Sequence, residues 1–203
     1  MNFEGKWLHE DGKYFNCCYI YSMIINNNPF PVLTTERLIL RKLDMIDADT
    51  LFQLRSNAEV NKYLHRPLPA SIEDVKAYIK MIDGLLADSK GVYWVICLKT
   101  DNKLIGAICM WNFKPEKDMT ELGYELSPEF QGRGLMQEAI EKIIAYGFND
   151  MRLKTITALP SPENERSVAL LKHNGFRLDT SYEFVSREDA EDQAVYILTA
   201  EGH

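Results

Sequence analysis

Apolar residues recur along the chain with two different periods, and each period predicts its own kind of element. Runs rich in β-branched and aromatic residues predict strands. These runs lie at residues 37–43, 92–98, 103–113, 120–126, 153–158, 176–185 and 194–198. Apolar residues spaced three or four positions apart predict helices at residues 47–57, 71–82, 135–148 and 161–172. Because no internal repeat or low-complexity linker interrupts this series, we expect a single domain.

Residues 1–30 differ in their pattern of residue types from the rest of the chain. Asp11-Gly12 separates two aromatic-rich stretches, which predicts a β-hairpin extension at the N-terminus. The exposed aromatic side chains of this hairpin would have to pack against the body of the protein or against a partner subunit, so the sequence is compatible with a homodimer. The main domain is expected at 31–200, and 201–203 resemble the start of an affinity-tag tail.

The formal net charge of the chain favours some classes of binding partner over others. The chain of 203 residues has a formal net charge of -7, so it lacks the basic footprint of a nucleic-acid-binding protein. Cationic substrates such as amines are favoured, and an anionic cofactor would need a local basic pocket. No apolar run approaches the length of about 20 residues that a membrane span requires, so we expect no membrane partner.

The four cysteines are Cys17, Cys18, Cys97 and Cys109. They form no Cys-x-x-Cys pair and no Cys/His spacing typical of a metal site. Cys97 and Cys109 lie within apolar runs and are expected to be buried thiols in a reducing compartment. The sequence therefore predicts a cytoplasmic protein with no metal.

The segment Gln131-Gly132-Arg133-Gly134-Leu135-Met136 lies between a predicted strand and a predicted helix. The first N–H groups of a helix have no partner within it, and they lie at the positive end of the helix dipole. Glycines allow the backbone to approach a ligand closely, so this turn suits a diphosphate. The plain alternative is a strand-to-helix turn that uses glycine only for tightness.

Two other nucleotide-binding motifs do not fit this segment. A Walker loop requires Gly, four residues and then Gly-Lys-Ser/Thr, which is absent. A dinucleotide fingerprint requires a glycine or alanine where Gln137 stands.

Residues 126–134, Leu-Ser-Pro-Glu-Phe-Gln-Gly-Arg-Gly, resemble the acetyl-CoA motif of the GNAT superfamily of N-acetyltransferases. Met136 replaces the usual small residue, as in the branch similar to the ribosomal-protein serine/alanine N-acetyltransferases (RimJ/RimL-like). Further stretches resemble the same branch over roughly residues 32–200, namely 35–41, 122–126, 164–167 and 174–176. The resemblance implies an α+β fold: a mixed, mostly antiparallel, twisted sheet flanked by helices, with strands that part near Leu126.

The resemblance also implies the roles of individual residues. Those that it assigns to acetyl-CoA are Leu126, Gln131, Gly132, Arg133, Gly134, Leu135, Met136 and Asn164. Ser167 stands where this branch protonates the departing CoA thiolate, and many relatives use a tyrosine one turn later. Leu171 occupies that position here, so the acid is either Ser167 or solvent. By motif position, Arg133, Arg166 and Lys172 are expected to gather near the phosphates.

A base is needed because an alkylamine is mostly protonated at neutral pH and attacks a thioester only when neutral. Glu121, Gly123 and Glu125 share one face of their strand, since alternate residues point the same way. Glu125 is nearest the expected cofactor loop and is the candidate base, with Glu121 in reserve. A backbone N–H near Leu126 could polarise the carbonyl.

The acceptor remains open at this level. The resemblance implies transfer of an acetyl group from acetyl-CoA to a primary amine, first of all a protein N-terminus. A small amine such as a polyamine, an amino acid or an aminoglycoside is the enzymatic alternative. The third interpretation is an acyl-CoA-binding module without turnover, because Leu171 stands where many relatives have the tyrosine.

Overall fold

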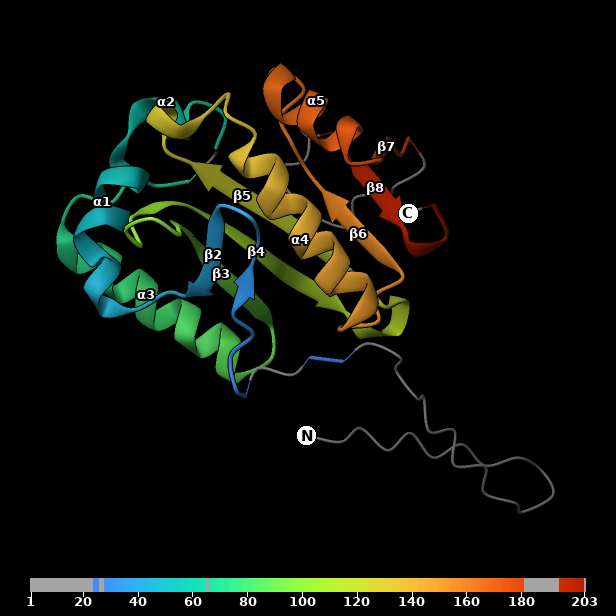
Figure 1. The fold of residues 1–203 in the computed structure, drawn as a ribbon, viewed down its shortest axis with the longest axis horizontal. Coiled ribbons are helices and arrows are strands. Elements are labelled where there is room, and N and C mark those ends of the chain that lie inside the picture. Colours follow the sequence, from blue (N-terminus) through green and yellow to red (C-terminus); the bar gives the residue numbers. More distant parts are fainter. Residues whose placement is uncertain (1–23, 26–27, 65, 181–193, 203) are drawn as a thin grey trace, which may run out of the picture.

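The computed structural model describes residues 24–25, 28–64, 66–180 and 194–202. Its strands form a single twisted sheet in the order β1-β2-β3-β4-β5-β6-β8-β7 (Figure 1). Neighbouring strands are antiparallel except for β5 and β6, which are parallel. The strands are β1 Leu33–Thr34, β2 Leu38–Lys42, β3 Gly91–Leu98, β4 Leu104–Lys114, β5 Met119–Leu126, β6 Thr155–Ala158, β7 Arg177–Leu178 and β8 Tyr196–Thr199. The predicted fold class is confirmed.

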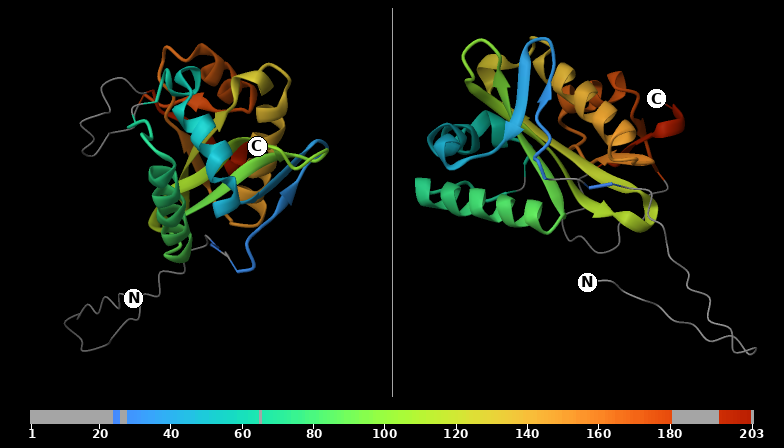
Figure 2. Two further views of the ribbon diagram at one scale, coloured as in Figure 1. Left: turned by 90° about the vertical axis from the view of Figure 1, so that its left-hand side faces the viewer. Right: turned by 60° about the horizontal axis from the view of Figure 1, so that its bottom comes forward.

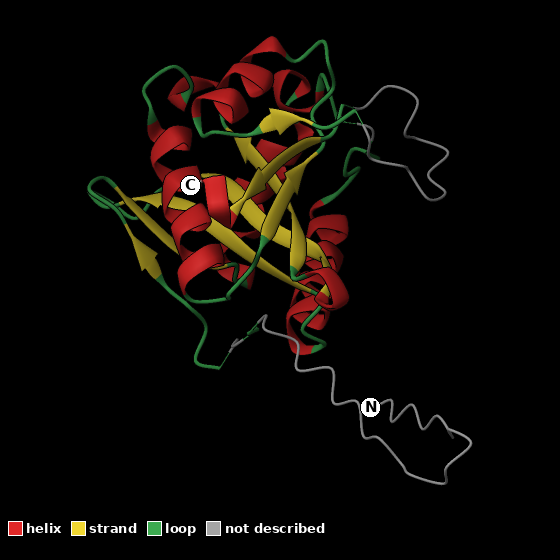
Figure 3. Cartoon of the chain, turned by 90° about the vertical axis from the view of Figure 1, so that its right-hand side faces the viewer, coloured by secondary structure: helices red, strands yellow, loops and turns green. Residues whose placement is uncertain are grey.

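Helices lie on both faces of this sheet (Figure 2, Figure 3). The α-helices are α1 Ala48–Ser56, α2 Ala58–Asn61, α3 Ile72–Ala87, α4 Leu135–Asn149 and α5 Glu165–His173. Short 3-10 helices lie at Met45–Asp47, Pro115–Lys117, Pro128–Phe130 and Ala200–Gly202. Helices α1 and α3 cover one face, and α4 and α5 cover the other, so the sheet is the middle of three layers.

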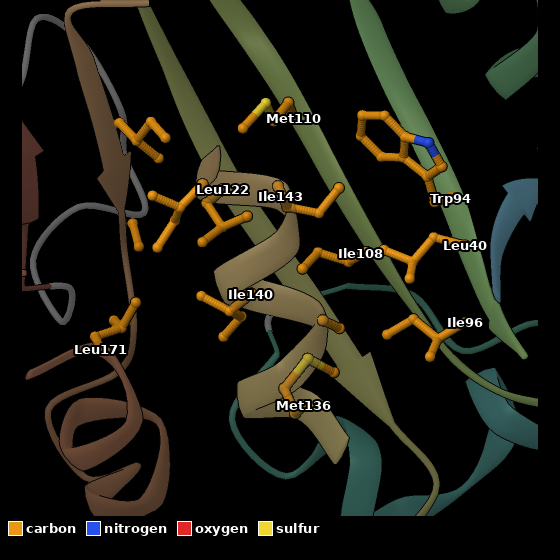
Figure 4. Packing of buried hydrophobic residues seen from close by; sticks show 14 of the residues in the cluster. Leu40, Trp94, Ile96, Ile108, Met110, Leu122, Met136, Ile140, Ile143 and Leu171 are labelled. Carbon is orange, nitrogen blue, oxygen red and sulfur yellow. The ribbon is translucent and has the colours of Figure 1, made fainter. Parts of the chain in front are cut away.

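Each face of the sheet has its own apolar core. The larger core joins α4 to the strands, with Trp94, Ile108 and Ile143 fully buried (Figure 4). The smaller core joins α1 and α3 to the opposite face through Leu51, Ile79 and neighbouring strand residues. The helices therefore bury one apolar stripe each, as their spacing of three to four residues predicts.

The sheet opens between β5 and β6. The two strands pair only at Met119–Glu121 with Thr155–Thr157. Beyond Glu121, β5 continues to Leu126 paired with β4, while β6 ends at Ala158 paired with β8. The strands thus part just before the loop that leads into α4, as predicted.

The side chains at the helix N-termini account for several boundaries. Ser71 caps α3 in a reciprocal capping box with Asp74, as its sequence predicts. The prediction that the last helix begins near residue 161 is wrong. Residues 161–164 form a turn closed by the Asn164 N–H to the Ser161 carbonyl at 2.9 Å, and Asn164 caps α5. An asparagine that satisfies a backbone donor of the first turn is a better helix start than Ser-Pro.

Several expectations fall wholly or partly outside the described ranges. They are the hairpin at 1–30, Cys17, Cys18, the second half of the strand expected at 176–185, and His203. Cys97 is buried and Cys109 is partly buried, and both are thiols. The described part of the chain contains no helix long and apolar enough to cross a membrane. In the same ranges, no group of three or more His, Cys, Asp or Glu side chains could hold a metal ion.

Candidate active site

The loop from Gln131 to Gly134 joins the end of β5 to the N-terminus of α4. Gly132 and Gly134 have positive φ angles of 72° and 73°, a conformation that side chains with a Cβ disfavour. A Cβ built on Gly132 would meet nothing within 4 Å, so the outer side of the loop is open. The loop is exposed, whereas the side chains of Leu135 and Met136 are buried beneath it. Main-chain N–H groups at the start of α4 can therefore face an anion.

The side chain of Gln131 within the loop and the side chain of Arg37 from outside it hold this loop. Gln131 Nε2 donates to the Leu126 carbonyl at 3.0 Å, which ties the loop to the end of β5. Arg37 Nη1 donates to the Arg133 carbonyl at 2.9 Å, and Arg37 is ion-paired with Glu138 of α4 at 2.6 Å. The loop is thus fixed in place without any ligand.

Basic residues lie close to the loop, in spite of the acidic chain. The Arg133 guanidinium lies 5.7 Å from the centroid of the Phe130 ring. Arg166 Nη1 donates to Gln131 Oε1 at 3.3 Å, so α5 contributes a cation as predicted. Lys172 lies in the last turn of α5, about 9 Å along the helix axis from Arg166. The three cations therefore do not form one tight cluster.

Asn164 and Ser167 lie at the first turn of α5. Asn164 Oδ1 accepts a hydrogen bond from the Ser167 N–H at 3.1 Å, which fixes the turn. The Ser167 hydroxyl is 2.8 Å from the hydroxyl of Tyr124 on β5. Sequence reasoning missed Tyr124, although it lies within the strand motif of residues 122–126.

Glu125 lies in a buried cluster on the face of β5 opposite to Tyr124. Arg66 Nη2 donates to Glu125 Oε2 at 2.5 Å, and Arg55 Nη1 lies 3.4 Å from Oε1. The Tyr93 hydroxyl donates to Oε1 at 3.3 Å. The candidate base is therefore surrounded by two cations and one phenol.

The pKa values of three tyrosine hydroxyls near the site are raised. Burial raises the pKa of Tyr93 well above its ordinary value. Burial also raises the pKa of Tyr78 to about 12, against the opposing effect of the Arg55 guanidinium, which lies 3.8 Å from the ring centroid. On the other face, burial raises the pKa of Tyr124 to about 12, although its hydrogen bond with Ser167 opposes the shift. All three hydroxyls keep their protons at neutral pH.

The strand β5 separates the two groups of residues, because successive side chains of a strand point to opposite faces. The loop, Asn164, Ser167 and Tyr124 lie with α4 and α5. Glu125 and its arginines lie with α1 and α3. Glu121 shares the face of Glu125 but lies where β5 is still paired with β6, and it accepts a hydrogen bond from Asn112 at 3.2 Å. Glu125, in contrast, lies where the strands have parted.

The residues that complete the Glu125 cluster were not predicted. Arg55 lies in the last turn of α1, Arg66 lies in the segment before α3, and Tyr93 belongs to β3. No motif or period connects these positions. The alternation on β3 that points Tyr93 to the same face as Val95 is the one signal that could have suggested part of the cluster.

Comparison with known proteins identifies the family. The family model "Acetyltransferase (GNAT) domain" matches residues 37–177. The chain is 35% identical to the uncharacterized N-acetyltransferase YoaA of Bacillus subtilis over 148 residues, covering 73% of this chain and 84% of YoaA. It is 28% identical to the spermidine N(1)-acetyltransferase of Escherichia coli K12, covering 69% of this chain and 73% of that one.

A solved structure shows the same fold. The ribosomal L7/L12 alpha-N-protein acetyltransferase RimL in complex with coenzyme A superposes with a TM-score of 0.70 at 21% identity, covering 85% of this chain and 98% of that one. With the family model over most of the domain and a relative above 30% identity, the chain belongs to the GNAT acetyltransferase family and is an acetyl-CoA-dependent N-acetyltransferase.

Proposed function

We propose that this enzyme acetylates the α-amino group at the N-terminus of a protein or peptide, and that Glu125 takes the proton of the amine. The observation that carries the proposal is the cluster in which the Glu125 carboxylate is paired with both Arg55 and Arg66. Two guanidiniums and one carboxylate give this cluster a net positive charge. A polyamine would bring further positive charges against it, which costs free energy at short range.

The ordinary pKa of the acceptor favours the same choice. An α-amino group has a pKa of about 7.7–8.0, whereas an alkylamine has a pKa of about 10.4. Near pH 7.5, about a third of the α-amine but only on the order of 0.1% of the alkylamine is neutral and able to attack. A net positive site suits an acceptor that arrives neutral. The alpha-N-protein activity in the name of the RimL structure supports this acceptor, and the spermidine relative supports the alternative.

We assign the diphosphate of acetyl-CoA to the main-chain N–H groups of Gly132, Arg133, Gly134, Leu135 and Met136. The N–H of Gln131 donates to the Pro128 carbonyl at 3.2 Å, so Gln131 would support the site through its side chain, which is hydrogen-bonded to Leu126. The backbone of Leu126 at the open edge of β5 would pair with the pantetheine arm, as an added strand does. The Nδ2 group of Asn164 carries two donors for the same arm. This path leads the thioester into the gap between β5 and β6.

The transfer itself is a direct displacement. The amine approaches from the face of α1 and α3, its nitrogen attacks the thioester carbonyl carbon, and a C–N bond forms as the C–S bond breaks. The proton of the amine passes to Glu125, directly or through a water molecule. The coenzyme leaves as a thiolate on the side of α4 and α5. A backbone N–H near Leu126 would stabilise the carbonyl oxygen as it gains charge.

Thiol release from acetyl-CoA, measured across a panel of amines, tests the proposal. We expect kcat/KM for N-terminal peptides to exceed that for spermidine, for free amino acids and for aminoglycosides by at least about tenfold. The Arg66→Gln variant provides the matched arm, because it removes one positive charge from the cluster. We expect it to raise the relative rate with spermidine several-fold. Higher kcat/KM for spermidine than for every peptide in the wild-type enzyme would refute the acceptor assignment.

A further inference from the structure

We propose that Tyr124 is a positioning residue for acetyl transfer: its hydroxyl orients that of Ser167 so that Ser167 donates a hydrogen bond to the departing sulfur of coenzyme A. The proposal rests on the assigned path of the coenzyme and is independent of the class of acceptor amine.

The two hydroxyls meet at the place where the strands part. Tyr124 lies three residues beyond Glu121, the last residue of β5 that pairs with β6. Ser167 comes from the first turn of α5, on the other side of the gap. The hydroxyl-to-hydroxyl distance of 2.8 Å therefore bridges β5 and α5 across the assigned path of the thioester.

Ser167 is held at two points. Asn164 Oδ1 accepts from its backbone N–H at 3.1 Å, and Tyr124 contacts its side-chain oxygen. A serine hydroxyl rotates freely and can accept while it donates. When the Tyr124 hydroxyl donates to Ser167 Oγ, the hydrogen of Ser167 is directed to a second acceptor. A sulfur that enters the gap would be that acceptor.

The pKa values of the Tyr124 phenol and of a thiol favour a hydrogen bond to the sulfur over complete proton transfer. The pKa of Tyr124 is raised to about 12, chiefly by burial. The ordinary pKa of a thiol is about 8.5, so a thiolate is too weak a base to take the proton from this phenol. In the proposed step the C–S electron pair stays on sulfur, Ser167 and Tyr124 keep their protons, and the thiolate takes a proton from solvent after release.

The helix position that holds tyrosine in many relatives cannot serve here. Leu171 is fully buried and packs in the larger core with Ile140 and Phe176. Figure 4 shows Leu171 within the same cluster as Met136 and Ile140. Its side chain is thus committed to the core, whereas the Tyr124 hydroxyl already reaches the helix from β5.

A double-mutant cycle on the full chain tests the proposal, with whichever amine the wild-type enzyme turns over. We expect Ser167→Ala to lower kcat about 100-fold and Tyr124→Phe about tenfold, with the KM for acetyl-CoA and the Kd for CoA changed less than about twofold. Since Tyr124 acts through Ser167, Tyr124→Phe should lower kcat less than about twofold in the Ser167→Ala background. Tyr146→Phe is the control, because it removes a hydroxyl from an aromatic ring packed against Trp94 on the same side of the sheet.

A second measurement separates positioning from general structural damage. The acetyl selenoester of CoA has a more acidic leaving group, which needs less stabilisation than the thiolate. We expect the loss in Tyr124→Phe to shrink from about tenfold to less than about threefold with this donor. An equal loss with both donors, an unchanged loss in the Ser167→Ala background, or a wild-type rate in Tyr124→Phe would overturn the proposal. A wild-type enzyme that prefers small amines to peptides would overturn only the acceptor assignment.

Discussion

The two faces of β5 are built in different ways. On the side of α4 and α5, the proposed coenzyme site consists of main-chain N–H groups in a loop with two glycines at positive φ. On the side of α1 and α3, the site consists of side chains, with Glu125 held by Arg55, Arg66 and Tyr93 from three separate elements. In the proposed assignment, coenzyme binding therefore depends on backbone conformation, and recognition of the acceptor depends on charge.

A site made of backbone groups and a site made of charged side chains differ in how readily their specificity changes. A backbone site suits any ligand with the same diphosphate and tolerates change in the surrounding side chains. A site made of charged side chains changes its preference when one residue is replaced. The acceptors named for similar proteins do differ, spermidine for one and the ribosomal protein L7/L12 for another.

Gly134→Glu is expected to weaken the proposed backbone site most. The substitution places a carboxylate at the positive end of α4 and a Cβ at a residue with φ of 73°, so we expect CoA affinity to fall at least about 1000-fold. Isothermal titration with CoA measures this loss. Gly134→Ala has the same backbone strain without the charge and should lose much less. Unchanged CoA affinity in Gly134→Glu would show that the loop does not hold the diphosphate.

Glu125→Gln tests the charged face. The amide keeps the shape of the side chain but cannot take a proton, so we expect kcat/KM to fall about 100-fold, with most of the loss below the pKa of the amine. The pH profile of kcat/KM between pH 6 and 9.5 gives the measurement, and the Kd for CoA should stay within about twofold. Arg55 and Arg66 would lose their counter-charge, so thermal unfolding is measured in parallel. A wild-type pH profile would remove Glu125 from the proton transfer.

The smallest expected effect compares the buried phenols on the two faces. The pKa values of Tyr78 and Tyr124 in the folded protein are both about 12, above the value of about 10 in the unfolded chain. Between pH 10 and 12 the unfolded state loses these protons first, so the free energy of unfolding falls as the pH rises. Tyr78→Phe and Tyr124→Phe should each reduce that fall by about 2 kcal/mol.

Urea unfolding at pH 8 and pH 11.5 measures this change. Tyr63→Phe removes a partly exposed phenol whose ring lies 5.0 Å from Lys62 Nζ, and it serves as the control. A fall of the same size in all three variants would show that burial does not govern the alkaline behaviour.

Much of the fold was predictable because its long elements carry a clear period. The strands at 92–98 and 120–126 and the helix at 135–148 lie within one or two residues of β3, β5 and α4. The two-residue strand β1 and the four-residue helix α2 are too short to show a period, and both were missed. The start of α5 was misplaced because Ser161-Pro162 resembles a helix start, whereas the cap is formed by Asn164.

The same contrast applies to the site. The loop from Gln131 to Gly134 was predictable because its glycines stand at fixed positions within a short run of consecutive residues. The contacts of Glu125 were not, because Arg55 and Arg66 come within reach only when α1 and the following segment pack onto the sheet. Tyr124 lay within a predicted strand, but its contact with Ser167 depends on how far α5 sits from β5.

The opening between β5 and β6 has a kinetic consequence. In the proposed arrangement, coenzyme and amine reach this opening from opposite faces of the sheet, so each substrate would have its own entrance and neither would have to leave before the other binds. We therefore expect a ternary complex that forms in either order, without an acetylated enzyme as an intermediate. A large acceptor, such as the end of a folded protein, could dock while coenzyme A is still in place, and the spent coenzyme could be exchanged behind it.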